Sequence, residues 1–171
     1  MDKLNEILRK KAIELGLCDE WQNAWKDGWD KNTLIQKFYD GIDFCLSNNY
    51  PSNDFIKENF DRDLLIKNNV LVDEKRSILN AKESAIFGGS KVIARYNYRA
   101  HGRIYIKDNA TLDVTAHNNS FVIVHILGSA KVVARCHDNA TLVLIKHSKQ
   151  CRIACFGSVA VKEENGLYDN P

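Results

Sequence analysis

The sequence predicts an α+β protein in which an N-terminal region of about three helices packs on a single-stranded parallel β-helix. Two pentapeptides indicate the β-helix, because each recurs at a multiple of ten residues. Asp108-Asn-Ala-Thr-Leu returns from Asp138, and Lys91-Val-Ile-Ala-Arg returns from Lys131 as Lys-Val-Val-Ala-Arg. Self-similarity at a fixed period is typical of stacked copies of one small unit, each burying its apolar side against its neighbours.

The distribution of charge also separates two regions. Residues 1–80 hold 12 Lys/Arg and 15 Asp/Glu, whereas residues 81–171 hold 12 Lys/Arg and 7 Asp/Glu. An asymmetry of this kind indicates two surfaces of different character. We expect a helical region over residues 1–72, a β-helix domain over 73–164 and a polar C-terminal tail over 165–171.

The helical region is predicted from apolar residues that recur every three or four positions. The first such stripe consists of Leu4, Ile7, Leu8, Ala12 and Leu15. A second helix is predicted from Asn32 or Thr33 through Leu46, and Pro51 prevents it from continuing. Ser52 can begin a third, short helix, since serine is a favoured helix cap.

Three tryptophans, Trp21, Trp25 and Trp29, follow one another at a spacing of four and share a face if that stretch is helical. Such a stripe can bind a ligand or a partner. It more often belongs to a core or to a seam between domains, because each ring buries a large apolar area. We expect these tryptophans to pack between the two regions.

The repeat region alternates apolar and polar side chains with a period of two, which predicts strands with one buried face. The even-numbered apolar or small residues include Val92, Ala94, Ile104, Ile106, Leu112, Val114, Ala116, Val122, Val124, Ile126, Val132, Ala134, Cys136, Leu142, Leu144, Ala154 and Phe156. The odd positions are mostly charged or polar. We therefore expect even positions inside and odd positions outside.

Two folds compete for this pattern. Asp-Asn, Asn-Asn and Gly-Ser pairs at the ends of the units suit the turns of an antiparallel meander. Across two-residue hairpins, however, the buried set must switch between even and odd at every strand. Here the even set stays apolar over at least five units. A chain that coils in one sense keeps this parity, so the pattern favours a parallel β-helix.

The outward positions alternate in character from one unit to the next, which predicts about twenty residues per coil. Units 111–120 and 131–140 have polar exteriors, whereas units 121–130 and 141–150 place apolar residues outside. Those apolar outward residues are Phe121, Ile123, Leu127, Val143 and Ile145. We expect the helical region to cover this apolar side, together with the three tryptophans.

A basic outer face is the main candidate binding site. Its predicted members are Lys91, Arg95, Arg103, Lys107, His117, Lys131, Arg135 and His137. Such a strip can contact a nucleic-acid backbone or an acidic protein surface. The alternative interpretation is a solvated face whose charges only maintain solubility.

All five histidines, His101, His117, His125, His137 and His147, occupy outward positions in this scheme. With twenty residues per coil, His117 and His137 lie side by side, about 4.8 Å apart. Two histidines in a ladder do not supply the three or four converging ligands of a metal site. We expect an exposed ladder and no bound metal or cofactor.

Catalytic patterns are missing from the sequence. Cys151 and Cys155 are predicted to point outward on one unit, but a single Cys-x3-Cys pair is a weak zinc signal. Asp113 is the one carboxylate expected on the solenoid wall, so the paired acids of polysaccharide-cleaving β-helix enzymes are absent. We expect a protein that is not an enzyme.

The expected location is the cytoplasm. The amino terminus shows no basic segment followed by an apolar stretch, so no secretory signal is expected. No apolar run approaches the length of a membrane span. Five irregularly spaced cysteines fit reduced thiols.

Several segments resemble small uncharacterised proteins of gut Bacteroidetes that occur in prophages and other mobile elements. These segments are residues 16–22 (GLCDEWQ), 41–46 (GIDFCL) and 50–56 (YPSNDFI), followed by the Asp-Asn-Ala repeat. The resemblance implies a helical head on a β-helix and no activity, cofactor or site residue. By analogy with accessory proteins of mobile elements, it also implies binding to a host protein, including defence systems such as CRISPR nucleases.

The sequence therefore leads to one expected function and two alternatives. The expected function is a non-enzymatic protein-binding module that binds and inhibits a host factor. The first alternative is a nucleic-acid-binding protein that uses the basic outer face. The second is a structural solenoid that assembles end to end into an oligomer.

Overall fold

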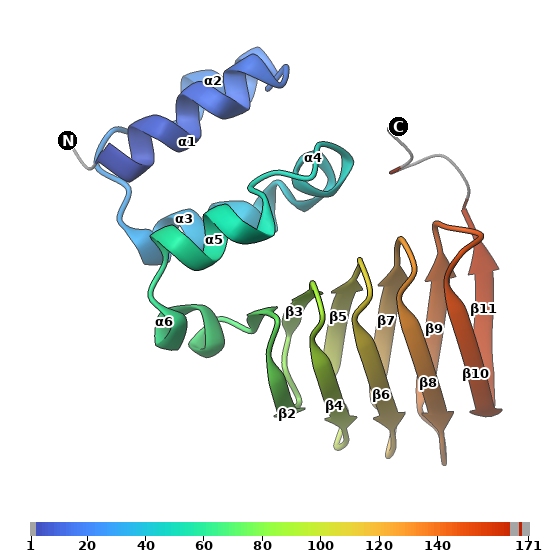
Figure 1. Cartoon of the computed structure of the whole chain (residues 1–171). Coiled ribbons are helices and arrows are strands. Elements are labelled where there is room, and N and C mark those ends of the chain that lie inside the picture. Colours follow the sequence, from blue (N-terminus) through green and yellow to red (C-terminus); the bar gives the residue numbers. More distant parts are fainter. Residues whose placement is uncertain (1–2, 165–167, 169–171) are drawn as a thin grey trace. The chain divides into compact units, whose positions relative to one another are not determined.

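The computed structural model describes residues 3–164 and residue 168, and it divides into two compact units (Figure 1). The helical unit extends to Leu65, and the solenoid unit begins at Ile66. No helix in the described part is both long and apolar enough to cross a membrane. Each unit is described by itself below.

The helical unit contains more and shorter helices than the three predicted. The helices of the described residues are α1 (Lys3–Glu14), α2 (Asp19–Ala24), α3 (Lys31–Asp40), α4 (Ile42–Ser47), α5 (Asn53–Asn59) and α6 (Arg62–Lys67). The predicted helix through Leu46 is divided at Gly41, which ends α3 and precedes α4. Glycine is a poor helix former, because ordering its backbone costs more entropy than ordering other residues.

Helix starts follow local side-chain chemistry. Asp30, rather than Asn32 or Thr33, caps α3, and its carboxylate accepts a 2.7 Å hydrogen bond from the Thr33 amide. That hydrogen bond lowers the pKa of Asp30. Ser52 caps α5 by accepting from the Phe55 amide, so the predicted start of this helix is confirmed.

The first apolar stripe is largely confirmed. Leu4, Leu8 and Ala12 are buried, whereas Ile7 remains 42% exposed. The Tyr50 hydroxyl donates a 2.7 Å hydrogen bond to the Leu8 carbonyl and so joins the end of α4 to α1. Burial raises the pKa of Tyr50 well above its usual value.

The solenoid unit is a parallel β-helix, as predicted. Its strands are β1 (Val70–Val72), β2 (Lys75–Leu79), β3 (Glu83–Phe87), β4 (Lys91–Tyr96), β5 (His101–Ile106), β6 (Thr111–Ala116), β7 (Phe121–Ile126), β8 (Lys131–Cys136), β9 (Thr141–Lys146), β10 (Arg152–Gly157) and β11 (Val159–Glu163). The odd-numbered strands form one sheet and the even-numbered strands form the other (Figure 1). We call these the odd-strand sheet and the even-strand sheet.

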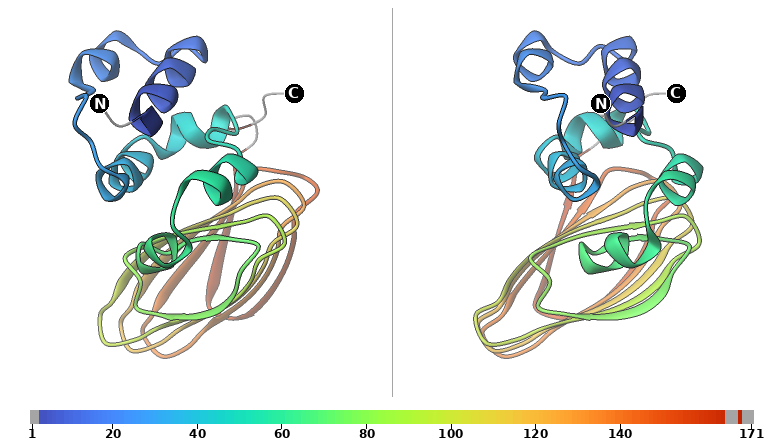
Figure 2. Two further views of the ribbon diagram at one scale, coloured as in Figure 1. Left: turned by 60° about the vertical axis from the view of Figure 1, so that its left-hand side comes forward. Right: turned by 90° about the vertical axis from the view of Figure 1, so that its left-hand side faces the viewer.

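Register within each sheet confirms a coil of about twenty residues. In the even-strand sheet Lys91 lies beside Thr111, and Thr111 lies beside Lys131. In the odd-strand sheet His101 lies beside Phe121 in the same way. Every recorded strand pair is parallel, so the antiparallel meander is excluded for the described residues. Figure 2 shows the coils stacked on one another.

The interior is built from the even-numbered side chains, as the parity predicted. The core of the solenoid includes Val92, Ala94, Ile104, Ile106, Leu112, Val114, Ala116, Val122, Val124, Ile126, Val132, Ala134, Cys136, Leu142 and Leu144. Burial of this continuous apolar column is the main source of stability, at about 25 cal/mol per Å² of apolar area. Ile66 also packs against this core.

The Asp-Asn-Ala motif forms the turns between the two sheets rather than hairpins. Asp108, Asn118, Asn119 and Asp138 all have positive φ, a conformation that Asp and Asn tolerate better than other residues with side chains. The Asp108 carboxylate also accepts a 2.8 Å hydrogen bond from the Gly88 amide in the preceding coil. The motif recurs at the turn after β5 and at the turn after β8, where Asp108 and Asp138 have the same positive φ.

The last coil departs from the predicted parity. Five residues separate β9 from β10, whereas four separate β8 from β9. The extra residue shifts the register, so Ile153 lies beside Val132 and Phe156 lies beside Arg135. The predicted burial of Ala154 and Phe156 is therefore wrong, and Phe156 is 54% exposed.

The same shift overturns the prediction that both Cys151 and Cys155 point outward. Cys151 belongs to the buried core, and its thiol donates to the Ser148 carbonyl at 3.0 Å. Cys155 lies beside Ala134, on the inward side of the strand, although it is exposed in the last coil. Desolvation raises the pKa of both thiols, which makes them less reactive than an ordinary cysteine.

Candidate binding surface

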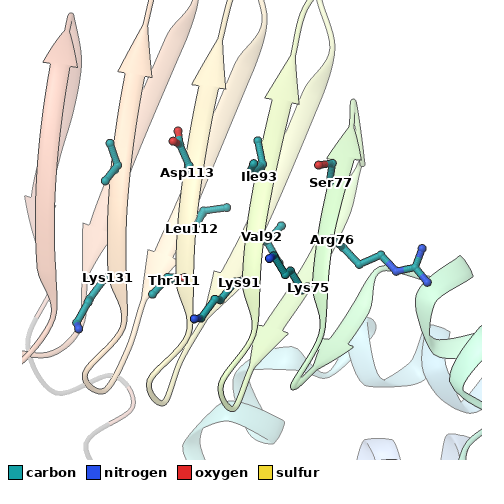
Figure 3. A pocket seen from close by; sticks show the side chains of 11 residues that line it. Lys75, Arg76, Ser77, Lys91, Val92, Ile93, Thr111, Leu112, Asp113 and Lys131 are labelled. Atoms are coloured by element: carbon teal, nitrogen blue, oxygen red, sulfur yellow. The ribbon is translucent and has the colours of Figure 1, made fainter.

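The outward side chains of the even-strand sheet form three rows across the strands, and we call this outer face the basic wall. The strand register places one residue of every even-numbered strand in each row. The first row, which we call the lysine row, consists of Lys75, Lys91, Thr111, Lys131 and Arg152. Figure 3 shows Lys75, Lys91, Thr111 and Lys131 at corresponding places on neighbouring strands.

The basic wall carries charge of almost one sign. The five strands of the even-strand sheet contain seven Lys or Arg residues and a single acidic residue, Asp113. The odd-numbered strands contain three Lys or Arg and two Glu residues. The positive balance of the repeat region is therefore concentrated on one sheet.

The cations of the lysine row have no carboxylate partner among the described residues. Among residues 3–164 and residue 168, no ion pair involves Lys75, Lys91, Lys131 or Arg152. Adjacent strands are about 4.8 Å apart, so Lys75 and Lys91 place like charges on neighbouring strands. This repulsion is weak in water but would be relieved by an anionic partner.

The central row is mainly apolar. It consists of Ser77, Ile93, Asp113, Val133 and Ala154. Ile93 is 45% exposed and is a large aliphatic side chain on the outer surface of the sheet. An open groove of about 640 Å³ runs over this row and the lysine row, and Arg76 also lines it (Figure 3).

The third row consists of Leu79, Arg95, Thr115, Arg135 and Phe156. The Arg135 guanidinium forms a close ion pair with Asp113 and lies 5.4 Å from the centre of the Phe156 ring. Asp113 is therefore neutralised within the wall. Arg95 forms no ion pair with any described residue.

The structure brings together most, but not all, of the predicted basic face. Lys91, Arg95, Lys131 and Arg135 share the basic wall. Arg103 belongs to the odd-strand sheet, where it lies between Glu83 and Ile123.

Lys107 also differs from the prediction of an exposed basic residue. It is 8% exposed, and its ammonium lies 4.7 Å from the centre of the Phe87 ring. Lys107 follows β5 in the odd-strand sheet, so neither it nor Arg103 belongs to the basic wall.

Two cations of the wall, Lys75 and Arg152, were not predicted, and neither was Arg76, which lines the groove. Lys75 precedes Lys91 by 16 residues, and Arg152 follows Lys131 by 21, so neither obeys the ten-residue period. Arg76 lies beside Val92, at a position that faces the core in later coils. The basic character of β2 and β10 was visible in the sequence, but their register was not.

His117 and His137 form the predicted ladder at the end of the basic wall. Their rings are stacked with centroids 4.6 Å apart, and the His117 Nδ1 lies 3.6 Å from the Asp138 carboxylate. His101, on the odd-strand sheet, is exposed beside Phe121. These three histidines occupy outward positions, as predicted.

The remaining histidines, His125 and His147, form a second stack. These two side chains are more buried than predicted. The His125 Nδ1 and His147 Nε2 atoms are 3.0 Å apart, and His125 also stacks on Tyr105. His147 is only 2% exposed, so the prediction of an exposed side chain is wrong there. No cluster of three or more metal-ligating side chains occurs among the described residues.

The three tryptophans do not form one helical stripe, because α2 ends at Ala24. The Trp25 indole donates a 2.7 Å hydrogen bond to the Asn5 side chain, and its ring lies 5.1 Å from that of Trp29. The Lys37 ammonium lies within 6 Å of the ring centres of Trp21 and Trp29. Their contacts described here are thus within the helical unit.

The apolar residues predicted to meet the tryptophans lie on the outer side of the odd-strand sheet, except Leu127, which directly follows β7. Phe121 is 38% exposed and Leu127 is 7% exposed. Ile123, Val143 and Ile145 have intermediate exposure. Packing of the helical unit on this face stays a prediction, as does the role of residues 165–167 and 169–171, which lie outside the described residues.

No family model, curated protein or solved structure matches this chain. The fold defines the class of the solenoid unit, a parallel β-helix, and a fold of this class supports many functions. The surface of the even-strand sheet is therefore the basis for a functional proposal.

Proposed function

We propose that this protein is a non-enzymatic protein-binding module whose basic wall contacts an acidic surface of a partner. The observation that carries the proposal is the concentration of seven Lys or Arg residues and one Asp on the five strands of one sheet. A charged surface of this kind accelerates association and selects partners of opposite charge.

The unpaired state of the lysine row supports binding over a purely solubilising role. Cations placed for solubility are usually interspersed with carboxylates. In the helical unit Lys11, Lys31 and Lys37 each form an ion pair with a nearby acid. Lys75, Lys91 and Lys131 instead face outward along one row and form no ion pair within the described part of the chain.

One feature favours a protein over a nucleic acid as the partner. Ile93 and Phe156 are large apolar side chains exposed among the cations, a composition typical of protein interfaces. The resemblance to mobile-element proteins makes a host factor the expected partner, and its inhibition is part of the proposal.

The test is affinity capture from a nuclease-treated bacterial lysate with three forms of the full chain. These are the wild type, the wall variant Lys91→Glu with Lys131→Glu, and the control variant Arg103→Glu with Lys162→Glu. Arg103 and Lys162 are exposed on the odd-strand sheet, so the control makes the same charge change on the other face.

The expected result is an acidic protein that the wild type and the control variant retain and the wall variant loses. Circular dichroism should show that all three forms are folded. If the wall variant captures the same proteins as the wild type, the proposal is wrong. Retention of nucleic acid instead of protein before nuclease treatment, with loss in the wall variant, would favour the nucleic-acid alternative.

A further inference from the structure

The basic wall has dimensions that suit a particular kind of partner. The lysine row and the third row are four residues apart along each strand, which corresponds to about 13 Å. Between them lies the central row with Ile93 and Val133. An α-helix with its side chains is about 10–12 Å wide, close to the separation of the two outer rows.

The spacing across the strands also agrees with a helix. Successive strands are about 4.8 Å apart, whereas a helix advances about 5.4 Å per turn. A helix lying across the five strands would therefore present about one turn to each strand. The row spans about 19 Å, the length of a helix of roughly 13 residues.

We infer that the basic wall binds an acidic amphipathic α-helix of a partner protein, which lies across the even-numbered strands. This inference rests on the proposed function and specifies the partner. Its apolar stripe would cover Ile93 and Val133 in the groove. Its acidic side chains would face the lysine row on one side and Arg95 on the other.

The charge distribution of the wall supports this arrangement. Asp113 would repel an acidic helix if its carboxylate were free, but Arg135 pairs with it. The wall cations that form no ion pair with a described residue are those of the lysine row and Arg95, which flank the apolar central row. Recognition of a helix by apolar anchors with charged flanks is an established mode of peptide binding.

The experiment uses synthetic probes and the full chain. The first probe is an 18-residue helical peptide with leucines at positions i, i+3, i+4 and i+7 and glutamates on both flanks. The second has the same composition, with the leucines scattered around the helix. The third replaces each glutamate of the first with lysine, and the fourth is a single-stranded oligothymidine of 20 nucleotides.

Binding of each labelled probe is measured by fluorescence anisotropy with wild-type protein and three variants. The variants are Lys91→Glu with Lys131→Glu, Ile93→Asn, and Phe121→Asn as a matched control. Phe121 is an exposed outward side chain of the odd-strand sheet, similar in exposure to Ile93. Both substitutions therefore remove a surface apolar group without disturbing the core.

The expected result is that the amphipathic acidic peptide binds about tenfold more tightly than the scattered one, since an apolar anchor contributes about that factor. Ile93→Asn should abolish this difference, Phe121→Asn should preserve it, and Lys91→Glu with Lys131→Glu should weaken both acidic peptides. The lysine peptide should not bind.

Failure of the inference differs from failure of the proposed function. If both acidic peptides bind equally and both depend on Lys91 and Lys131, the inference of an amphipathic helical partner is wrong. The proposal of an acidic protein partner is then still supported. The inference of a helical partner is also wrong if Ile93→Asn and Phe121→Asn change the affinity for the amphipathic acidic peptide equally. If oligothymidine binds and neither acidic peptide does, both proposals are wrong.

Discussion

The two sheets of the solenoid share one interior but have different exteriors. Val114 of the even-strand sheet and Val124 of the odd-strand sheet are both fully buried. Outside, the even-strand sheet carries unpaired cations, whereas the odd-strand sheet carries Phe121, Ile123 and near-neutral charge. A repeat fold therefore fixes its inward positions by packing and leaves its outward positions free to differ.

The largest expected effect separates inward from outward positions on a single strand. Val114→Asp places an unpaired carboxylate in the core, and we expect a loss of about 4 kcal/mol or more in the free energy of unfolding. Thr115→Asp, the next residue, faces outward beside Arg95 and Arg135 and should change that free energy by less than about 1 kcal/mol. Urea denaturation measures both, and equal losses would contradict the assigned parity.

A second prediction concerns the interior that the two sheets share. Gly102 of β5 faces inward, and a Cβ atom there would overlap the ring of Tyr96. Tyr96 is fully buried, and its hydroxyl donates a 2.9 Å hydrogen bond to the Ala81 carbonyl. Gly102→Ala should therefore cost about 1–3 kcal/mol through overpacking.

Thermal unfolding of the Gly102→Ala variant tests this close approach. Combining it with Tyr96→Leu should recover part of the loss, because the smaller side chain leaves room for the new methyl group. An unchanged midpoint for Gly102→Ala alone would show that Tyr96 does not occupy this space.

A smaller effect distinguishes the two outer faces by their charge. Removing two unpaired cations with Lys91→Gln and Lys131→Gln should raise the free energy of unfolding by roughly 0.5 kcal/mol at low salt. The gain should shrink at high salt, because ions screen the repulsion between exposed charges. Arg103→Gln, on the odd-strand sheet, should produce no salt-dependent gain when measured by the same urea titrations.

The smallest effect concerns an ion pair at the end of the odd-strand sheet. The Lys146 ammonium lies 2.6 Å from the Glu163 carboxylate. Its hydrogen bond lowers the pKa of Glu163 and raises the pKa of Lys146. A lowered carboxyl pKa stabilises the fold above the unfolded value of 4.5, and that contribution is lost as pH falls through the folded pKa.

The stability that Lys146 contributes depends on pH in the opposite direction to that of Glu163. Its raised pKa stabilises the fold below the unfolded value of 10.5, and the contribution is lost as pH rises through the folded pKa. Glu163→Gln should therefore lower the unfolding midpoint slightly between these limits, and the difference from wild type should vanish at either extreme. Melting curves across pH measure this, and a difference that persisted below the folded pKa of Glu163 would contradict the pairing.

The register of the repeat was predictable because its signal is local and periodic. The period of ten and the constant parity from Val92 to Leu144 predicted parallel strands and a coil of about twenty residues, which the pairing of Lys91 with Thr111 confirms. The first and last coils were not predictable, because spacings of 16 and 21 residues break the period. The lysine row was therefore only partly visible, and Arg103 was assigned to the basic outer face although its strand belongs to the other sheet.

By itself, the sequence determined which side chains face the core of the solenoid from Val92 to Leu144, since alternation along a strand and repetition between strands are properties of the chain order. Only the tertiary structure decided which outward residues become neighbours. The coil brings Lys75, Lys91, Lys131 and Arg152 into one row from positions far apart in sequence, and it assigns Arg103 to the other sheet. The physical reason is that neighbours across strands depend on the length of every intervening turn, and one added residue moves a side chain to the opposite face.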